Sequence, residues 1–204
     1  MGDQLPDDPW WFVIGGQAVR CLCPYRPSRD VNFGVGATTN LDALALSLEA
    51  SGVLEVRERT DATLHAVWNG VSISVFVLPE AAAHTTGRRL SVDGILATKL
   101  HAVLDRGRRR DFFDLYVVMQ QERLGIADCL NAIRVVYAQS VNDSLLLRAL
   151  VYFADADEEA PLPGEGPSDW TTVKAFFERR VGDLLVPPGK ALAIQANAVD
   201  VCAG

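Results

Sequence analysis

The strongest constraint on this chain is a glycine pair, Gly15-Gly16, that separates an apolar run from a second strand-like run about a dozen residues later. The apolar run at residues 11 to 14 predicts a short strand, and the glycines after it predict a turn into a helix. Glycine lets the backbone approach a phosphate closely, and the N–H groups at a helix N-terminus bind anions. This order of elements therefore predicts a phosphate-binding edge.

A second polar segment, residues 28 to 32 with the sequence SRDVN, leads into an apolar stretch that predicts a strand over residues 31 to 35. Side chains alternate between the two faces of a strand, so Asp30 and Asn32 are expected to point the same way, toward one metal-bound anion. Asp30 offers a carboxylate and Asn32 a neutral carbonyl oxygen, and Mg²⁺ accepts such oxygen ligands together with phosphates and waters. The alternative is structural, with Asp30 paired to Arg29 or Arg26 at the start of the strand.

The rest of the pattern predicts a small sheet followed by helices, and hence an α+β fold. Asn69-Gly70 between two apolar runs is the strongest short signal for a β-hairpin. Ser91 is a typical N-cap, and Gly52 a typical helix stop. The predicted elements are strands over residues 10 to 14, 31 to 35, 64 to 68 and 71 to 78, and helices over residues 40 to 51 (capped by Thr39 or Asn40), 92 to 105, 111 to 122, 126 to 139, 143 to 153 and 170 to 185.

Lys99, Asp111 and Asp114 are ionisable residues within apolar helical patterns. Lys99 falls in the apolar stripe of the helix after Ser91, and a buried ammonium is costly unless it has a partner or reaches a cleft. Snorkelling to the helix edge is the alternative for this lysine. Asp111 and Asp114 lie one turn apart at the start of the next helix, so at least one is expected to face inward. The helix dipole also favours acid there, which leaves a capping role open for each.

These residues resemble the two motifs of a known family, the minimal nucleotidyltransferases of the AbiEii type, which are toxins of bacterial toxin–antitoxin and abortive-infection systems. The first family motif is Gly-Gly or Gly-Ser, a spacer, then Ser/Thr-x-Asp-x-Asp, similar to Gly15-Gly16 and residues 28 to 32. The second is a lysine helix followed by Arg-Asp-x-x-Asp-Leu, similar to Lys99 and residues 110 to 115. The resemblance implies a nucleotidyltransferase-like small mixed β-sheet with flanking helices, followed by a helical half.

The resemblance also implies roles for individual residues. Asp111 would be a catalytic acid, or the base that takes a proton from the acceptor hydroxyl directly or through one water. Turn chemistry after Pro27 is the alternative for Ser28, and a solvated loop is the alternative for the arginines of residues 106 to 110. By resemblance, the catalytic residues are Asp30, Lys99 and Asp111; Gly15, Gly16, Ser28 and Lys99 bind the nucleotide; Asp30 and Asn32 hold a weakly bound Mg²⁺ or Mn²⁺; and Arg29, Arg110 and Asp114 contact the acceptor or its phosphates.

The chain departs from the family pattern at the predicted metal site. Asn32 stands where the family has a second carboxylate, and Ser72 and Ser74 occupy the later strand on which many relatives carry a third acid. A unit charge missing beside a cation costs on the order of 4 kcal/mol at short range in a protein-like dielectric. Two interpretations stay open. One is an enzyme that moves a nucleoside monophosphate from a triphosphate to a hydroxyl, and the other is a catalytically degenerate relative that binds a nucleotide or a partner.

Charge and composition bear on the expected partners and location. The net charge of −7 argues against a general nucleic-acid binder, but arginines cluster at both motifs, and the local field decides whether phosphate binds. Without a membrane-length apolar run or a basic start of a secretory signal, a cytoplasmic location is expected. The expected partners are a nucleoside triphosphate, an RNA acceptor such as the end of a transfer RNA, and a cognate antitoxin, with no membrane.

Four segments are expected along the chain. Residues 1 to 90 form a nucleotidyltransferase-like α/β core, and residues 91 to 154 a helical half that completes the cleft. Residues 155 to 168, acidic and rich in Pro and Gly, form an exposed linker. Residues 169 to 204 form a C-terminal helix and tail.

Histidines and cysteines are assigned no chemistry at this point. His65, His84 and His101 have no metal-ligand spacing. Cys21 and Cys23 do not form a CxxC pair, and they are expected as core residues of a protein from a reducing compartment.

Overall fold

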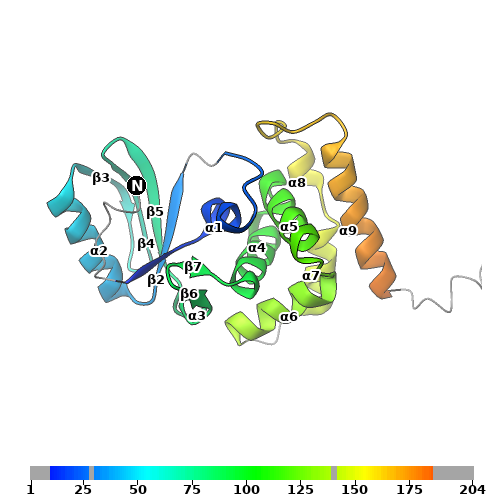
Figure 1. The fold of residues 1–204 in the computed structure, drawn as a ribbon, viewed down its shortest axis with the longest axis horizontal. Coiled ribbons are helices and arrows are strands. Elements are labelled where there is room, and N and C mark those ends of the chain that lie inside the picture. Colours follow the sequence, from blue (N-terminus) through cyan, green and yellow to red (C-terminus); the bar gives the residue numbers. More distant parts are fainter. Residues whose placement is uncertain (1–9, 28–29, 139–141, 186–204) are drawn as a thin grey trace, which may run out of the picture.

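One mixed β-sheet and a group of helices make up the fold (Figure 1), which a computed structural model describes for residues 10–27, 30–138 and 142–185. Within these ranges, seven strands join in the order β3-β4-β5-β2-β1-β7-β6. The strands are β1 (Trp11–Val13), β2 (Val31–Val35), β3 (Leu54–Arg59), β4 (Thr63–Trp68), β5 (Val71–Val77), β6 (Thr85–Thr86) and β7 (Arg89–Leu90). The helices are α1 (Gly15–Leu22), α2 (Thr38–Ser51), α3 (Pro79–Ala82), α4 (Val92–Arg106), α5 (Arg109–Glu122), α6 (Ile126–Tyr137), α7 (Asp143–Leu150), α8 (Ala154–Asp157) and α9 (Asp169–Leu185).

The centre of the sheet carries the strands on which the candidate site is built. β2 runs parallel to β5 and antiparallel to β1, while β4 is antiparallel to both β3 and β5. Asn69 and Gly70 both have positive φ, 47° and 81°, as the predicted hairpin requires. The Asn-Gly signal therefore set both the turn and the register of β4 against β5.

One face of this sheet is apolar and is covered by α2, which Figure 1 shows at the left of the sheet. Leu41, Leu44 and Leu48 of α2 are fully buried there, and the indole N–H of Trp68 donates to the Leu48 carbonyl at 3.0 Å. The strand residues of this core are Trp11, Phe33, Val35, Leu64, Ala66, Trp68, Ile73 and Val75. Because side chains alternate along a strand, the residues between them turn to the opposite face, toward α1.

The second core joins α1 to the helical half. Ser91 caps α4, because its hydroxyl accepts from the Gly94 N–H at 3.2 Å, and Gly107 ends this helix at φ 50°. The apolar face of α9 packs on α5, with the rings of Phe112 and Phe177 5.8 Å apart. The C-terminal helix thus buries its hydrophobic stripe within this chain.

The predicted α+β fold, with a small mixed sheet followed by a helical half, is confirmed, and several boundaries are corrected. β3 was not predicted, because it is an exposed edge strand with the charged sequence LEVRER rather than an apolar run. α2 begins at Thr38 after an Ala37 N-cap that makes no side-chain hydrogen bond, so neither Thr39 nor Asn40 is its cap. The division into four segments stays a prediction.

The predicted linker is mostly exposed, but it contains a helix and a buried contact, and the predicted buried thiols differ from the structure. α8 occupies the start of the linker segment, and the Glu165 side chain within it is only 3% exposed. Cys21 is exposed and Cys23 is half-buried, so neither is a core residue, and only Cys129 is buried among the described cysteines.

Candidate functional site

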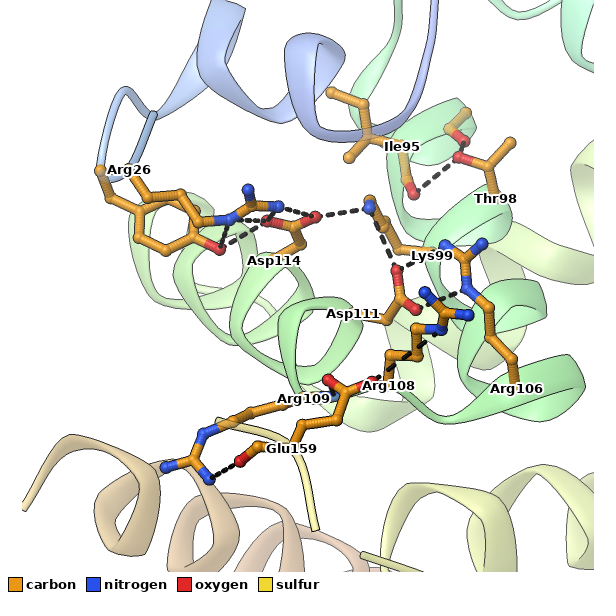
Figure 2. A network of polar contacts seen from close by, with 12 residues as sticks. Arg26, Ile95, Thr98, Lys99, Arg106, Arg108, Arg109, Asp111, Asp114 and Glu159 are labelled. Carbon is orange, nitrogen blue, oxygen red and sulfur yellow. Dashed lines mark hydrogen bonds and ion pairs between the residues drawn. The ribbon is translucent and has the colours of Figure 1, made fainter. Parts of the chain in front are cut away.

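A row of alternating charges lies between α1 and the helical half, with Lys99 at its centre (Figure 2). The Lys99 ammonium is 2.5 Å from Asp114 Oδ2 and 3.4 Å from Asp111 Oδ1. Both aspartates are fully buried and the lysine is 5% exposed. Lys99 therefore does not snorkel to the helix edge, because it has two carboxylate partners inside the protein.

Asp111 is held by a guanidinium fork as well as by the lysine. Arg106 Nε donates to Asp111 Oδ2 at 2.9 Å and Arg106 Nη2 donates to Oδ1 at 3.0 Å. Burial by itself would raise the pKa of this carboxyl, but the Arg106 hydrogen bonds and the charge of Lys99 together hold the pKa of Asp111 below its ordinary value. A carboxylate stabilised in this way takes up a proton poorly. Its partners are side chains of α4, so it does more than cap α5.

Asp114 is held by the segment that follows α1. Arg26 Nη2 donates to its two oxygens at 2.9 and 3.0 Å, and the Tyr25 hydroxyl donates to Oδ1 at 2.5 Å. Burial and the Asp114 charge raise the pKa of Tyr25, which keeps this hydroxyl protonated as a donor. Asp114 thus binds an arginine distant in sequence, whereas Arg106 at the end of α4 binds Asp111. An acceptor contact through Asp114 would require this network to open.

The row has an excess of positive charge. It contains the three cations Arg26, Lys99 and Arg106 and the two carboxylates Asp111 and Asp114. Buried charges act strongly on one another, so the two carboxylates fix the cations in place and leave one positive charge unpaired within the row, although Asp105 in the cavity lining also acts on Arg106. Such a row attracts an anion to any cavity that it borders.

A cavity of about 230 Å³ borders the row and reaches the predicted glycine turn. Gly15, Asn32, Lys99 and Arg106 all line it. Gly15 has φ +64°, and a Cβ built there would lie 2.9 Å from Asn32 Nδ2, so both the backbone and the neighbouring side chain require glycine. The remaining lining residues are Ile14, Phe76, Leu78, Thr98, His101, Ala102, Asp105 and Tyr137.

The N-terminus of α1 borders this cavity, because its N-cap Ile14 and its first residue Gly15 line it. Its N-cap is Ile14, which offers no side-chain hydrogen bond, and its first turn holds no acid. The first N–H groups of a helix have no partner within the helix and carry a partial positive charge. Together with Lys99 and Arg106, these amides make a site suited to phosphate. Two larger hollows, each of about 530 Å³, border neither Lys99 nor Arg106.

The structure brings only some of the predicted site residues together. Gly15, Asn32 and Lys99 share the cavity, and Asp111 contacts Lys99 directly. Asp30 is exposed just before β2 and does not line the cavity, and Gly16 is the second residue of α1. Ser28 and Arg29 lie outside the described residues. Arg110 is half-buried in the first turn of α5, where its charge helps lower the Asp111 pKa.

The described part of the chain contains no group of three or more His, Cys, Asp or Glu side chains that could hold a metal ion. Asn32 is neutral and Ser74, its partner on β5, brings no charge. A divalent ion bound here would depend on ligands from the substrate.

Comparison with known proteins shows the family of this chain. A family described as "Nucleotidyl transferase AbiEii toxin, Type IV TA system" matches residues 77–188, more than half of the chain. The chain belongs to this family. The match contains the second motif, with Lys99, Asp111 and Asp114. The first motif lies before the matched residues.

Two similar proteins extend the likeness over most of this AbiEii-family chain. The uncharacterized protein aq_aa25 of Aquifex aeolicus (strain VF5) is 26% identical over 184 residues, which cover 86% of this chain and 88% of the relative. A solved structure of an H. pylori protein provisionally named a nucleotidyltransferase aligns with a TM-score of 0.53 and 16% identity, covering 85% of this chain and 87% of that one. At this identity the second likeness shows the fold alone. No helix in the described ranges has both the length and the apolar character to cross a membrane.

Sequence reasoning missed several residues of the network. Tyr25 and Arg26 carry no motif signal, because their role depends on a contact with Asp114 across 89 and 88 positions of sequence. Arg109 was grouped with the solvated arginines, but it is 8% exposed and pairs with Glu165. The arginine run itself could not reveal which member turns inward.

Proposed function

We propose that this protein transfers a nucleoside monophosphate from a nucleoside triphosphate to a hydroxyl acceptor, with pyrophosphate as the other product. The acceptor class we favour is RNA, for example the end of a transfer RNA. The observation that carries the proposal is the cavity where the α1 N-terminus, Lys99 and Arg106 converge. Its volume is below the roughly 300–1,000 Å³ of common ligand pockets, which suits a phosphate tail with the base outside.

Each charged residue has a defined part in this proposal. The first amides of α1, the Lys99 ammonium and the Arg106 guanidinium bind the phosphates and stabilise charge that develops on them. Asp111 and Asp114 hold these cations in position through the contacts at 2.5 to 3.4 Å. Arg29 and Arg110 would contact the acceptor phosphates.

The oxygen donors of the first motif fit Mg²⁺ or Mn²⁺ only as part of a nucleotide complex. Asp30 would supply a carboxylate and Asn32 a carbonyl oxygen, with the remaining ligands from the triphosphate and water. When bound, the ion would neutralise phosphate oxygens. The lack of a three-ligand cluster among the described residues supports weak binding without nucleotide.

Labelled nucleotide transfer tests the proposal. The wild-type protein is incubated with each labelled nucleoside triphosphate, Mg²⁺ or Mn²⁺ and total RNA, and labelled RNA is the expected product. Arg106→Gln removes a half-exposed phosphate contact and should abolish labelling, with circular dichroism as the check on folding. Lys174→Met is the matched control, because Lys174 pairs with Asp157 outside the cavity. Absence of labelled product with every nucleotide and metal would contradict the proposed activity.

A catalytically degenerate relative is the second candidate function, and Asn32 is the observation that favours it. This residue lines the cavity where the family has a carboxylate, so nucleotide or partner binding could persist without transfer. Asn32→Asp separates the candidates. A large gain of transfer activity indicates a weakened enzyme, whereas nucleotide binding with no gain indicates a binding protein.

We also propose an antitoxin partner, which co-expression with the neighbouring gene product and co-purification would test.

A further inference from the structure

A row of polar side chains crosses four strands on the sheet face opposite α2. Glu58 of β3 pairs in register with His65 of β4, His65 with Ser74 of β5, and Ser74 with Asn32 of β2. His65 Nδ1 and Ser74 Oγ are 2.8 Å apart, which is a hydrogen bond. Register partners project from the same face of a sheet, so the row leads from an edge carboxylate to the cavity.

A β-bulge aligns Glu58 with this row. The register of β3 against β4 shifts between Val56 and Glu58. Just after the shift, Arg59 reaches the opposite face, where its Nη2 is 2.5 Å from Asp42 Oδ1 on α2. Because neighbours along a strand alternate, Glu58 shares the face of His65.

This polar row on the sheet, which is distinct from the ionic row around Lys99, meets the candidate site at Asn32 and Phe76. Both residues line the cavity, and the rings of His65 and Phe76 are in edge contact at 5.6 Å. Ser74 and His65 are half-buried and adjoin these two residues without lining the cavity themselves, so an acceptor hydroxyl would approach them at the edge of the cavity beside Asn32. The charged groups around this polar row are Glu58 on β3 and, in the lining of the cavity, Lys99, Asp105 and Arg106.

Transfer to a hydroxyl requires a proton acceptor. The residue predicted for this role, Asp111, already pairs with two cations. Asp111 is bound by Arg106 and Lys99, and its pKa is held low. An imidazole is the side chain best suited to take up a proton near neutral pH. His65 is the histidine whose ring nitrogen bonds a hydroxyl on the face that Asn32 shares.

We propose that Ser74 and His65 together accept the proton of the attacking hydroxyl, an inference that rests on the proposed transferase activity. The acceptor oxygen forms a bond to the α-phosphorus, and the bond from that phosphorus to the pyrophosphate oxygen breaks, its electron pair leaving with pyrophosphate. The acceptor proton passes to Ser74 Oγ as the Ser74 proton passes to His65 Nδ1, which becomes an imidazolium. Ser74 is the catalytic residue, and His65 acts through it as a positioning and proton-accepting residue.

His65→Asn tests this inference, because the asparagine amide keeps a hydrogen-bonding group near the position of Nδ1 but does not titrate. We expect transfer to fall by about 10²-fold or more, within the usual range for acid–base catalysis, with unchanged affinity for the nucleoside triphosphate. The fall in rate at acidic pH that reports imidazole protonation should disappear in this variant. Ser74→Ala should give a similar loss, and it keeps the test valid if His65→Asn folds poorly. His84→Asn, in the turn before β6, is the matched control.

The tautomer of His65 gives a readout without turnover. With three histidines in the chain, ¹⁵N NMR can assign each ring. We expect an unprotonated Nδ1 and a protonated Nε2 in neutral His65, because the serine must donate to Nδ1. A protonated Nδ1 in the neutral ring would overturn the inference. So would His65→Asn with wild-type rate and pH profile, which would leave the transferase activity standing. A wild-type protein that binds nucleotide but never transfers it would overturn both proposals.

Discussion

Lys99 is the residue on which the ionic row depends, because it contacts two buried carboxylates at once. Replacing it by methionine keeps the volume of the stem but leaves Asp111 and Asp114 each short of a cation. Breaking a buried ion pair from one side typically destabilises a protein by about 3–5 kcal/mol. We predict a loss of this size for Lys99→Met in the free energy of unfolding, measured with urea. Lys174→Met, which breaks a more exposed pair, should change it by about 0–1 kcal/mol. Equal losses in the two variants would show that the row is not a buried network.

Asp111 makes stability depend on acid pH. Its pKa in the folded protein is lowered, so its stabilising effect is present above the ordinary carboxyl pKa of about 3.9 and is lost as pH falls through the lower folded-state pKa. We predict that the wild-type free energy of unfolding falls steeply with acidification below about pH 4. Asp111→Asn should be less stable at pH 7 and show a shallower fall. Parallel pH profiles for the two proteins, measured by urea unfolding, would contradict the assigned carboxylate.

Among the elements, the segment between α8 and α9 is attached to α5 by Arg109. This guanidinium pairs with the nearly buried Glu165 and lies 4.8 Å from the Trp170 ring centre. In Arg109→Met, Glu165 would lose its buried partner, so we predict faster amide hydrogen exchange over residues 158 to 168 and in the first turn of α9. Arg108→Met is the control, since its contact with Glu159 is an exposed pair at 3.9 Å. Unchanged exchange in Arg109→Met would mean that apolar packing alone holds this segment.

The position of a helix or strand could be predicted where the sequence holds a local signal. It could not be predicted where a contact distant in sequence determines it. The Asn-Gly pair and the Ser91 cap act within a few residues, and both elements they delimit were predicted. β3 was not predicted, because an exposed edge strand is not required to be apolar. Within the linker segment, the contact of Glu165 with Arg109, 56 positions earlier, could not be predicted from composition.

The same contrast between local signals and distant contacts holds for the candidate site. Gly15 and Lys99 could be singled out, since a glycine turn before a helix and a lysine in an apolar stripe are local anomalies. Asp111 and Asp114 could be singled out as well, but the pairing of Asp114 with Arg26 could not, because these two residues meet only after the chain folds. The His65–Ser74 pair depends on the register of β4 with β5, which gives neither residue a motif of its own.

At the scale of the whole molecule, the ionic row couples the two halves of the fold. Arg26 and Tyr25 follow α1, and their shared partner Asp114 lies on α5 of the helical half. If this contact stabilises both halves, its loss should lower the local stability on both sides of the cavity and not only at the substituted residue. We predict that Arg26→Met lowers the free energy of unfolding by about 3–5 kcal/mol, because Asp114 remains buried with fewer donors.

Hydrogen exchange distinguishes a coupling role for Arg26 from a local one. In Arg26→Met, exchange should accelerate in α1, in residues 23 to 27 and at the start of α5, while the β4–β5 hairpin, which packs on α2, keeps its protection from local opening. Arg57→Met is the control, since Arg57 forms an exposed pair with Glu55 on the edge strand. Faster exchange confined to residues 23 to 27 would show that the row only anchors a loop. Faster exchange on both sides would show that the contact of Arg26 with Asp114 holds the two halves together.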